Sequence, residues 1–318
     1  MRIIYMGSPQ ASILPLEFLL RNDKRRHEVV AVVSQAAKEV GRGRHPLDPP
    51  LAAYAKEKSL LTFQPQKARE PEFLESISKL APDIIITCAY GQILTDAFLA
   101  IPKRATINIH PSLLPQYRGA TPVQSALLDG SEETGVTILF TVKALDAGNI
   151  IVQKTFPILH GETAGELTRR LFALSCPLLE EALKTLEDKA FIGRPQDERN
   201  VTLCRKIQKE DGEINWQGTK KTIENRFRAY HPWPGSFTFL GTKRIIVPLM
   251  SISDKTGGEE PGRLDFSKTE KALFVACADG WMRVHELKPE GARALAAVEF
   301  WNGLRTGDRA GKMGRMKD

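Results

Sequence analysis

The amino-acid sequence predicts an α/β protein in which a doubly wound, Rossmann-like and mostly parallel sheet precedes an OB-like β-barrel. Up to about residue 188, continuous apolar runs alternate with helical patterns, which is typical of parallel strands covered on both faces. Beyond residue 208, short β-like runs separated by Gly and Pro replace this alternation, as in a small antiparallel barrel. The length of 318 residues allows about two domains, each with its own core.

The predicted elements follow one another along the chain. In the first domain, strands are expected at residues 2–6, 28–34, 83–90, 105–110, 135–142 and 149–158. Helical patterns cover residues 13–20, 51–58, 71–80, 121–130 and about 163–187. In the second domain, β-like runs lie at 236–240, 243–252, 272–278 and 281–288. We therefore expect the first domain at 1–188, a polar linker at 189–208 and the barrel at 209–318.

The net charge of +7 is unevenly distributed along the chain. From Arg205 to the end there are 21 Lys and Arg against 15 Asp and Glu, which leaves 24 against 23 for the preceding residues. This basic last third favours a polyanionic partner, because phosphates attract such a surface. Taken alone, the charge is explained equally well by a solubilising surface.

Several classes of protein are disfavoured. The four cysteines form no C-x-x-C pair, which favours reduced thiols and argues against a zinc site or a disulfide framework. The apolar run at the N-terminus is too short for a signal peptide, and no stretch reaches the ~18 apolar residues of a membrane span. The first βα turn, M-G-S-P, lacks the later glycines of the G-x-G-x-x-G fingerprint, which disfavours an NAD(P)-dependent enzyme. We expect a cytoplasmic protein that binds no metal and does not associate with membranes.

One predicted strand carries an unusual polar pair. In A-T-I-N-I-H-P, residues 105–111, alternation places Asn108 and His110 on one face while the isoleucines enter the core. Pro111 cannot continue a central ladder, so His110 lies at the carboxyl end of the strand, where open α/β sheets bind ligands. A half-buried strand with a solvated polar face is the alternative for either residue considered alone.

Asp146 completes a candidate catalytic set. It follows the strand predicted at 135–142, and we expect neighbouring parallel strands to bring it to the same sheet edge as Asn108 and His110. An amide, an imidazole and a carboxylate suit acyl transfer between two substrates, because two groups stabilise an oxyanion while the carboxylate orients the imidazole or moves a proton. Ser112 is the alternative nucleophile, but it lies outside a G-x-S-x-G motif and equally fits a turn cap.

These residues carry a family resemblance. The ordered motifs N-I-H-P-S-L-L-P, Y-R-G, E-T-G-V-T and L-D-A-G resemble the folate-dependent formyltransferases, which move a formyl group from 10-formyltetrahydrofolate to an amine. The resemblance implies that Asn108, His110 and Asp146 are catalytic. It further implies that the folate co-substrate is bound by Tyr90, Gly91, Gln92, Ile93, Ser112, Leu113, Leu114 and Pro115.

Further motifs are similar to one branch of this family, the methionyl-tRNA formyltransferases. The M-G-S-P opening, D-G-E-I-N-W and R-A-Y-H-P-W-P-G-S-F-T extend the similarity over nearly the full length. The resemblance implies that initiator methionyl-tRNA is the acceptor and that the loop at residues 35–50 contacts its acceptor stem through Arg42 and Arg44. Lys206 and Lys209 are expected to contact the tRNA backbone, and we expect a monomer.

Two other functions stay open from the sequence. The same Asn, His and Asp set serves formyltransferases that act on amino sugars or nucleotide sugars, for which the basic last third has no RNA role. A tRNA-binding protein without activity is the third alternative, against which the complete set argues. The chain also departs from the family pattern at Gln10-Ala11-Ser12 and at His45-Pro46, which bear on the folate pocket wall and on the arginine loop.

Overall fold

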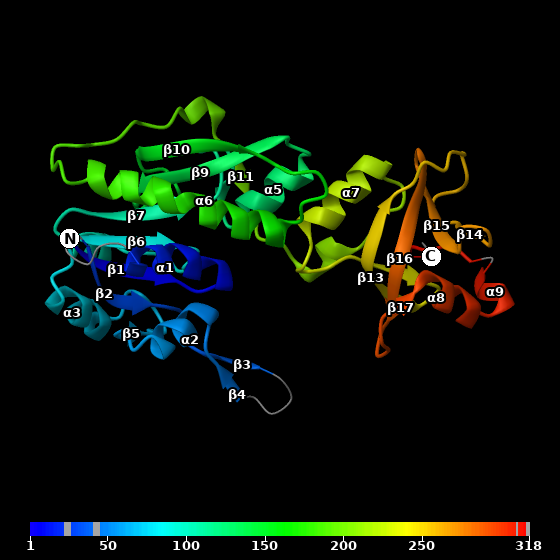
Figure 1. Ribbon diagram of the computed structural model, residues 1–318, viewed down its shortest axis with the longest axis horizontal. Coiled ribbons are helices and arrows are strands. Elements are labelled where there is room, and N and C mark those ends of the chain that lie inside the picture. The colour runs from blue at the N-terminus through cyan, green and yellow to red at the C-terminus, as the bar shows by residue number, and fades with distance from the viewer. Residues whose placement is uncertain (22–26, 41–44, 310, 316–318) are drawn as a thin grey trace. The chain divides into compact units, whose positions relative to one another are not determined.

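The computed structural model describes residues 1–21, 27–40, 45–309 and 311–315 of the chain. By their internal contacts the residues form two units, each with its own sheet (Figure 1). The N-terminal unit comprises Met1–Val123, Glu132–Ile158 and Glu166–Arg205. The C-terminal unit comprises Gln124–Ser131, Leu159–Gly165 and Lys206–Asp318.

Within the described residues, the sheet of the N-terminal unit has seven strands in the order β10-β9-β7-β6-β1-β2-β5. Its parallel part consists of β5 (Thr62–Phe63), β2 (Glu28–Val33), β1 (Arg2–Gly7), β6 (Ile84–Cys88) and β7 (Ala105–His110). At one edge lie β9 (Glu133–Phe140) and β10 (Ile150–Pro157), and β9 runs antiparallel to both β7 and β10. The predicted mostly parallel sheet is confirmed, with one reversed strand beside β7.

Apolar runs place the central strands in the core on both faces. The four residues of β1 from Ile3 to Met6 are fully buried. On one face, Ile4 and Met6 belong to a cluster with Phe73 of α3 (Pro71–Lys79). Elsewhere α1 (Ile13–Arg21) lies beside α6 (Ala164–Thr185), whose Cys176 thiol donates to the α1 backbone (Figure 1).

Shorter helices and strands complete this part of the chain: α2 (Pro50–Glu57), α4 (Asp96–Leu99), α5 (Pro122–Leu128) and the antiparallel pair β3 (Lys38–Val40) and β4 (His45–Leu47). The helix α4 and the strands β3 and β4 were not predicted from the sequence, because elements of three or four residues carry no periodicity. No helix among the described residues is long and apolar enough to cross a membrane.

The C-terminal unit contains an antiparallel sheet. As far as the structure describes the chain, the strands are β12 (Phe237–Leu240), β13 (Lys243–Ile252), β16 (Gly280–Pro289), β15 (Ala272–Cys277), β14 (Leu264–Ser267) and β17 (Leu295–Ala296), which pairs with β16. Near the C-terminus, Met313 bridges to Leu240 of the edge strand β12, and Lys312 bridges to Arg263, which directly precedes the opposite edge strand β14. The predicted β runs are confirmed, whereas the helices α7 (Lys220–Ala229), α8 (Ala297–Gly303) and α9 (Thr306–Arg309) were missed.

The segment that the sequence indicated as a linker contains a short strand. Strand β11 (Leu203–Cys204) pairs in parallel with β8 (Arg118–Gly119), which lies in the loop after β7. Residues up to Arg205 of this segment therefore belong to the N-terminal unit, and Leu203 and Cys204 contact the loop that follows His110.

Candidate active site

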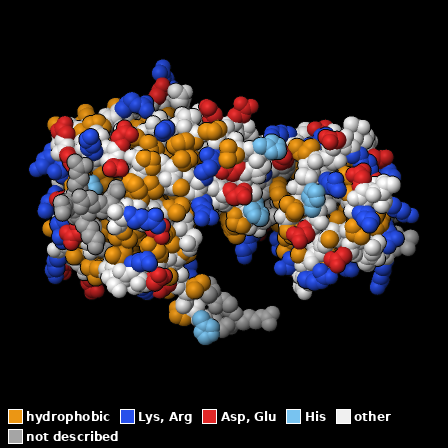
Figure 2. Space-filling model, in the orientation of Figure 1, with side chains coloured by type: hydrophobic (Ala, Val, Ile, Leu, Met, Phe, Trp, Pro, Cys, Tyr) orange, Lys and Arg blue, Asp and Glu red, His pale blue; other side chains and the backbone are white. Residues whose placement is uncertain are grey.

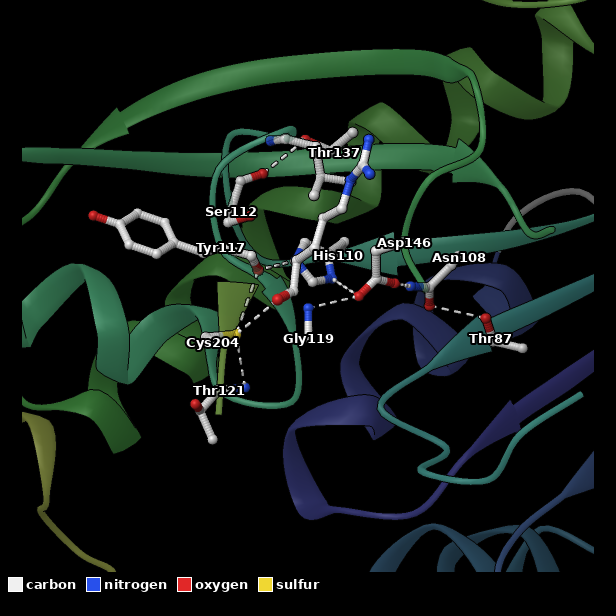
Figure 3. A network of polar contacts seen from close by, with 12 residues as sticks. Thr87, Asn108, His110, Ser112, Tyr117, Gly119, Thr121, Thr137, Asp146 and Cys204 are labelled. Atoms are coloured by element: carbon white, nitrogen blue, oxygen red, sulfur yellow. Dashed lines mark hydrogen bonds and ion pairs between the residues drawn. The ribbon is translucent and has the colours of Figure 1, made fainter. Parts of the chain in front are cut away.

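Asn108 and His110 occupy the end of β7, as predicted. His110 is 4% exposed and Asn108 is half-buried. The alternating residues Ile107 and Ile109 are buried in the core. Strand β7 pairs with β6 as far as the Thr87 and Asn108 pair, and Pro111 follows directly after the last strand residue. Both polar side chains turn to the same neighbour, Asp146 (Figure 3).

Asp146 meets this pair, but the expected reason was wrong. Strand β9 runs antiparallel to β7, with Phe140 opposite Ile107, so the two strands do not end at a common edge. Instead, the loop after β9 folds back over the end of β7 and carries Asp146 in a left-handed backbone conformation, with φ of +48°. Such a conformation costs about 1–3 kcal/mol in a residue other than glycine and persists only where its surroundings hold it.

Three groups hold the Asp146 carboxylate. Asn108 Nδ2 donates to Oδ1 at 3.3 Å, and the Gly119 backbone N–H donates to Oδ2 at 2.9 Å. His110 Nδ1 lies 3.7 Å from Oδ2, and the aspartate side chain is only 13% exposed. The carboxylate is thus partly desolvated, and each of its oxygens has a donor.

The Asn108 amide has a defined orientation. Thr87 Oγ1 donates to Asn108 Oδ1 at 2.8 Å, which leaves Nδ2 facing the carboxylate. Because a carboxylate oxygen only accepts, the opposite assignment of the amide would place two acceptors together. One of the two Nδ2 hydrogens is used by Asp146, and no hydrogen bond among the described residues uses the second.

The tautomer of His110 follows from its second neighbour. His110 Nε2 lies 3.0 Å from the Tyr117 carbonyl oxygen, which can only accept, so Nε2 carries a hydrogen. Nδ1 is therefore the ring nitrogen that faces Asp146 and the one at which a proton is gained or lost. Tyr117 itself has a φ of +61°, so the carbonyl that fixes the ring belongs to an unusual turn.

Ser112 caps a turn in this structure. Its side chain is fully buried, and its hydroxyl donates to the Gln116 carbonyl at 2.7 Å, which matches the turn-cap alternative. The residues after it form a fixed backbone segment, since Thr137 Oγ1 donates to the Ser112 carbonyl and Gln153 Nε2 donates to the Leu114 carbonyl. Leu114 is buried against Leu139 and Ile150. Leu113 and Pro115, which flank it, are half-buried.

The segment after β6, predicted to bind folate, contains residues of different kinds. Gln92 accepts from the Ala68 N–H at 2.7 Å, so its side chain supports a neighbouring backbone. Tyr90 is 3% exposed, and no described residue hydrogen-bonds its hydroxyl. Burial, together with Glu70, raises the pKa of Tyr90 to about 12. Gly91 has a φ of +80°, and Ile93 is 88% exposed.

The residues predicted to contact tRNA are only partly visible. Arg42 and Arg44 lie outside the described residues. Lys206 and Lys209 are exposed in the C-terminal unit, where Lys209 begins a short 3-10 helix, Lys209–Gly212.

No group of three or more His, Cys, Asp or Glu among the residues that the structure describes is placed to hold a metal ion.

Sequence reasoning missed the groups that support the site. Thr87, Tyr117, Gly119 and Gln196 act on Asn108, His110 and Asp146, and two of them do so through backbone atoms. The Y-R-G motif at 117–119 was the one available signal, because it lies close to the polar pair. Nothing local in the sequence indicates Gln196, since its contacts are made across 50 and 48 residues.

Two family descriptions match this chain. "Formyl transferase" matches residues 1–183 and "Formyl transferase, C-terminal domain" matches residues 206–305. Together with the Asn, His and Asp cluster on an α/β sheet, they define the protein as a formyltransferase.

Curated relatives narrow this class. The methionyl-tRNA formyltransferase of Geobacter sulfurreducens is 36% identical over 319 residues, covering 100% of this chain and 99% of the relative. That of Roseiflexus castenholzii is 38% identical over 314 residues, covering 98% and 99%. The chain belongs to the methionyl-tRNA formyltransferase family, as the motifs predicted.

Solved structures share the fold. The methionyl-tRNA formyltransferase from Clostridium thermocellum matches with a TM-score of 0.59 at 16% identity, covering 80% of this chain and 94% of that one. An N-formyltransferase from Helicobacter canadensis, in complex with folinic acid and dTDP-3-aminofucose, matches with a TM-score of 0.61 at 18% identity, covering 92% and 99%. The shared architecture thus occurs in a methionyl-tRNA formyltransferase and in an N-formyltransferase solved with folinic acid and dTDP-3-aminofucose.

The Asp146 loop makes Gly148 intolerant of a side chain. A Cβ at this position would lie 1.8 Å from the Phe140 carbonyl oxygen, a backbone atom that cannot move alone. We expect Gly148→Ala to destabilise the N-terminal unit by about 2–3 kcal/mol and to speed amide hydrogen exchange in the 140–150 segment. Chemical denaturation and exchange mass spectrometry measure these effects. Gly303→Ala is the control, because a Cβ there meets nothing within 4 Å; equal behaviour of the two variants would contradict the expected strain.

Proposed function

We propose that this chain transfers the formyl group of 10-formyltetrahydrofolate to the α-amine of methionine on initiator methionyl-tRNA, giving N-formylmethionyl-tRNA for translation initiation. The observation that carries the proposal is the Asp146 carboxylate held by Asn108 and His110, in a chain that aligns with methionyl-tRNA formyltransferases over its full length. In this proposal the chain acts as a monomer in the cytoplasm.

The geometry supports a defined role for each catalytic side chain. Attack of an amine on the formyl carbon creates an oxyanion, and in this proposal the second Nδ2 hydrogen of Asn108 donates to it. A preorganised donor at such a site contributes ~3–4 kcal/mol to lowering the barrier. The attacking amine must lose a proton while the departing nitrogen gains one, and Asp146 and His110 Nδ1, 3.7 Å apart, form a pair that can carry it.

The residues proposed for the folate co-substrate fit a flat, polar aromatic ligand. When bound, the folate supplies an activated formyl group. Tyr90 offers a buried hydroxyl that hydrogen-bonds no described residue, and Ile93 offers an exposed apolar side chain. A few placed polar groups beside apolar surface are the usual composition of such a site. Ser112, Leu113, Leu114 and Pro115 add a backbone segment held by Thr137 and Gln153, which supports a fixed wall beside His110.

The tRNA contacts rest on charge and on the family resemblance. Lys206 and Lys209 are exposed and belong to the basic last third of the sequence. Figure 2 shows Lys and Arg on the visible face of the C-terminal unit interspersed with Asp and Glu. Contacts from exposed lysines to tRNA phosphates weaken as salt is raised. Arg42 and Arg44 are proposed to contact the acceptor stem on the basis of the sequence.

A formylation assay tests the proposed function. Purified protein, 10-formyltetrahydrofolate and methionyl-tRNA are expected to give N-formylmethionyl-tRNA, with initiator tRNA used more efficiently than elongator tRNA charged with the same amino acid. Product is measured by chromatography of the released aminoacyl group. Formylation of amino sugars alone, with no product on either tRNA, would contradict the proposal and support the sugar alternative.

His110→Ala tests the assigned chemistry. We expect kcat to fall about 10²–10³-fold, because general acid–base transfer contributes factors of this size, while the melting temperature stays close to the parent value. His285→Ala is the matched control, since this histidine lies in β16 with Ser251 as its partner. A His110→Ala variant with nearly normal kcat would refute the role.

Arg42→Ala tests the proposed loop contact. We expect KM for methionyl-tRNA to rise about tenfold, with the affinity for folate unchanged. The slope of log affinity for tRNA against log salt concentration should decrease by the equivalent of roughly one phosphate contact. Arg69→Ala, an exposed arginine outside residues 35–50, serves as control. Equal losses in folate and tRNA binding would point to misfolding and remove the support for a specific contact.

A further inference from the structure

The loop at residues 117–121 supplies two backbone atoms to the active site. The Tyr117 carbonyl accepts from His110 Nε2, and the Gly119 N–H donates to Asp146 (Figure 3). Both residues have positive φ, at +61° and +125°. A Cβ at Gly119 would lie 2.5 Å from the Cys204 carbonyl oxygen, so the loop backbone is closely packed against the segment that carries Cys204. The conformation of this loop therefore decides where the imidazole and the carboxylate lie.

The loop is held by residues 196–204, which we call the bracing segment. Thr202 accepts from the Tyr117 N–H through its hydroxyl at 2.7 Å and from the Arg118 N–H through its carbonyl at 2.9 Å. The Cys204 thiol donates toward the Arg118 carbonyl at 3.3 Å and accepts from the Thr121 N–H at 3.3 Å. These bonds run the length of the loop and fix both ends of it.

Gln196 connects the bracing segment to Asp146 directly. Its Nε2 donates to the backbone carbonyls of Asp146 and Gly148, at 2.7 and 2.8 Å. Its Oε1 accepts from Arg118 Nε and Nη2, at 3.1 and 2.9 Å. Carbonyls only accept and a guanidinium only donates, so the amide can take one orientation, in which both hydrogens and both lone pairs are used.

Arg118 closes a ring of contacts. Its guanidinium is 7% exposed and also pairs with Glu198, Nη2 to Oε1 at 2.7 Å, which satisfies an otherwise costly buried charge. The chain of contacts runs from the Asp146 carboxylate to Gly119, through Arg118 to Gln196, and back to the Asp146 carbonyl. Asp146 is thus held at its carboxylate and at its backbone by the same closed network.

We propose that Gln196 is a positioning residue for formyl transfer. It holds the left-handed backbone of Asp146 and, through Arg118, the 117–121 loop that orients His110. The inference rests on the proposed function in taking Asp146 and His110 as catalytic. It assigns a catalytic-site role to a segment that the sequence marked only as a linker.

Two substitutions of Gln196 separate its two sets of contacts. Gln196→Ala removes both. Gln196→Glu keeps an acceptor for Arg118 but places a carboxylate against the two carbonyl oxygens, so only the Asp146 side is lost. Asn149→Ala is the matched control, because Asn149 Nδ2 donates to the Ile192 carbonyl and so joins the same two stretches of chain without touching Asp146 or Arg118.

Steady-state kinetics gives the test. We expect Gln196→Ala and Gln196→Glu to lower kcat by about 10–100-fold, since small misplacements of catalytic groups have effects of this size. KM for methionyl-tRNA and the affinity for 10-formyltetrahydrofolate should stay within about twofold of the parent. Asn149→Ala should keep kcat. A normal kcat in Gln196→Glu would overturn the inference, as would losses confined to KM.

A second readout separates this inference from the proposed function. In folded Gln196→Ala, which loses the Arg118 contact, we expect amide exchange of the 117–121 peptide to be faster than in the parent. In Gln196→Glu, which keeps that contact, exchange there should be faster by a smaller factor, because the loss of the Asp146 backbone contact loosens the acceptor of the Gly119 N–H. Exchange should be unchanged in Asn149→Ala. If the parent protein fails to formylate methionyl-tRNA, the proposed function fails while exchange still tests the brace. Unchanged exchange in both Gln196 variants would overturn the inference whatever the activity. Should Gln196→Ala not fold, Gln196→Glu, of nearly equal volume, carries the same test.

Discussion

The arrangement of the candidate active site depends on one aspartate whose backbone is held in an unfavourable conformation. Asp146 reaches Asn108 and His110 because its residue turns into the left-handed region, at φ of +48°. Hydrogen bonds from Asn108 and Gly119 to the carboxylate and from Gln196 to the carbonyl stabilise this conformation. Two residues further on, the Phe140 backbone lies so close to Gly148 that a side chain there is excluded. If this conformation relaxed, the amide and the imidazole would lose their common partner.

Much of the N-terminal fold was predictable because its signals are local. Continuous apolar runs marked β1, β2, β6 and β7, and Pro111 marked where β7 ends. Asn108 and His110 could be paired from the two-residue repeat of a strand. The same local reasoning predicted that Asp146 joins them, yet it used a parallel neighbour where the sheet has an antiparallel one. The direction of β9 depends on a return connection that leaves no periodicity in the sequence.

The supporting contacts could not be predicted, for a different reason. Thr87, Gly119 and Gln196 are ordinary residues in their own segments and become important only when strands and loops distant in sequence meet. Ser112 illustrates the converse. Its nearness to His110 left open a nucleophile or a cap, and a hydrogen bond to the Gln116 carbonyl uses its hydroxyl in the turn. The roles of polar residues near an active site are thus decided by tertiary partners.

The pairing of β11 with β8 has a consequence for how this protein can be divided. The change in sequence pattern alone suggests a domain boundary near residue 188. A fragment that ends there would lack Gln196, Glu198, Thr202 and Cys204. The Arg118 guanidinium would then lose Gln196 and Glu198, the acceptors that hold it in place, and the backbone donors of Tyr117 and Arg118 would lose Thr202. An excised catalytic module must therefore extend to about residue 205, where the contacts of the N-terminal unit end.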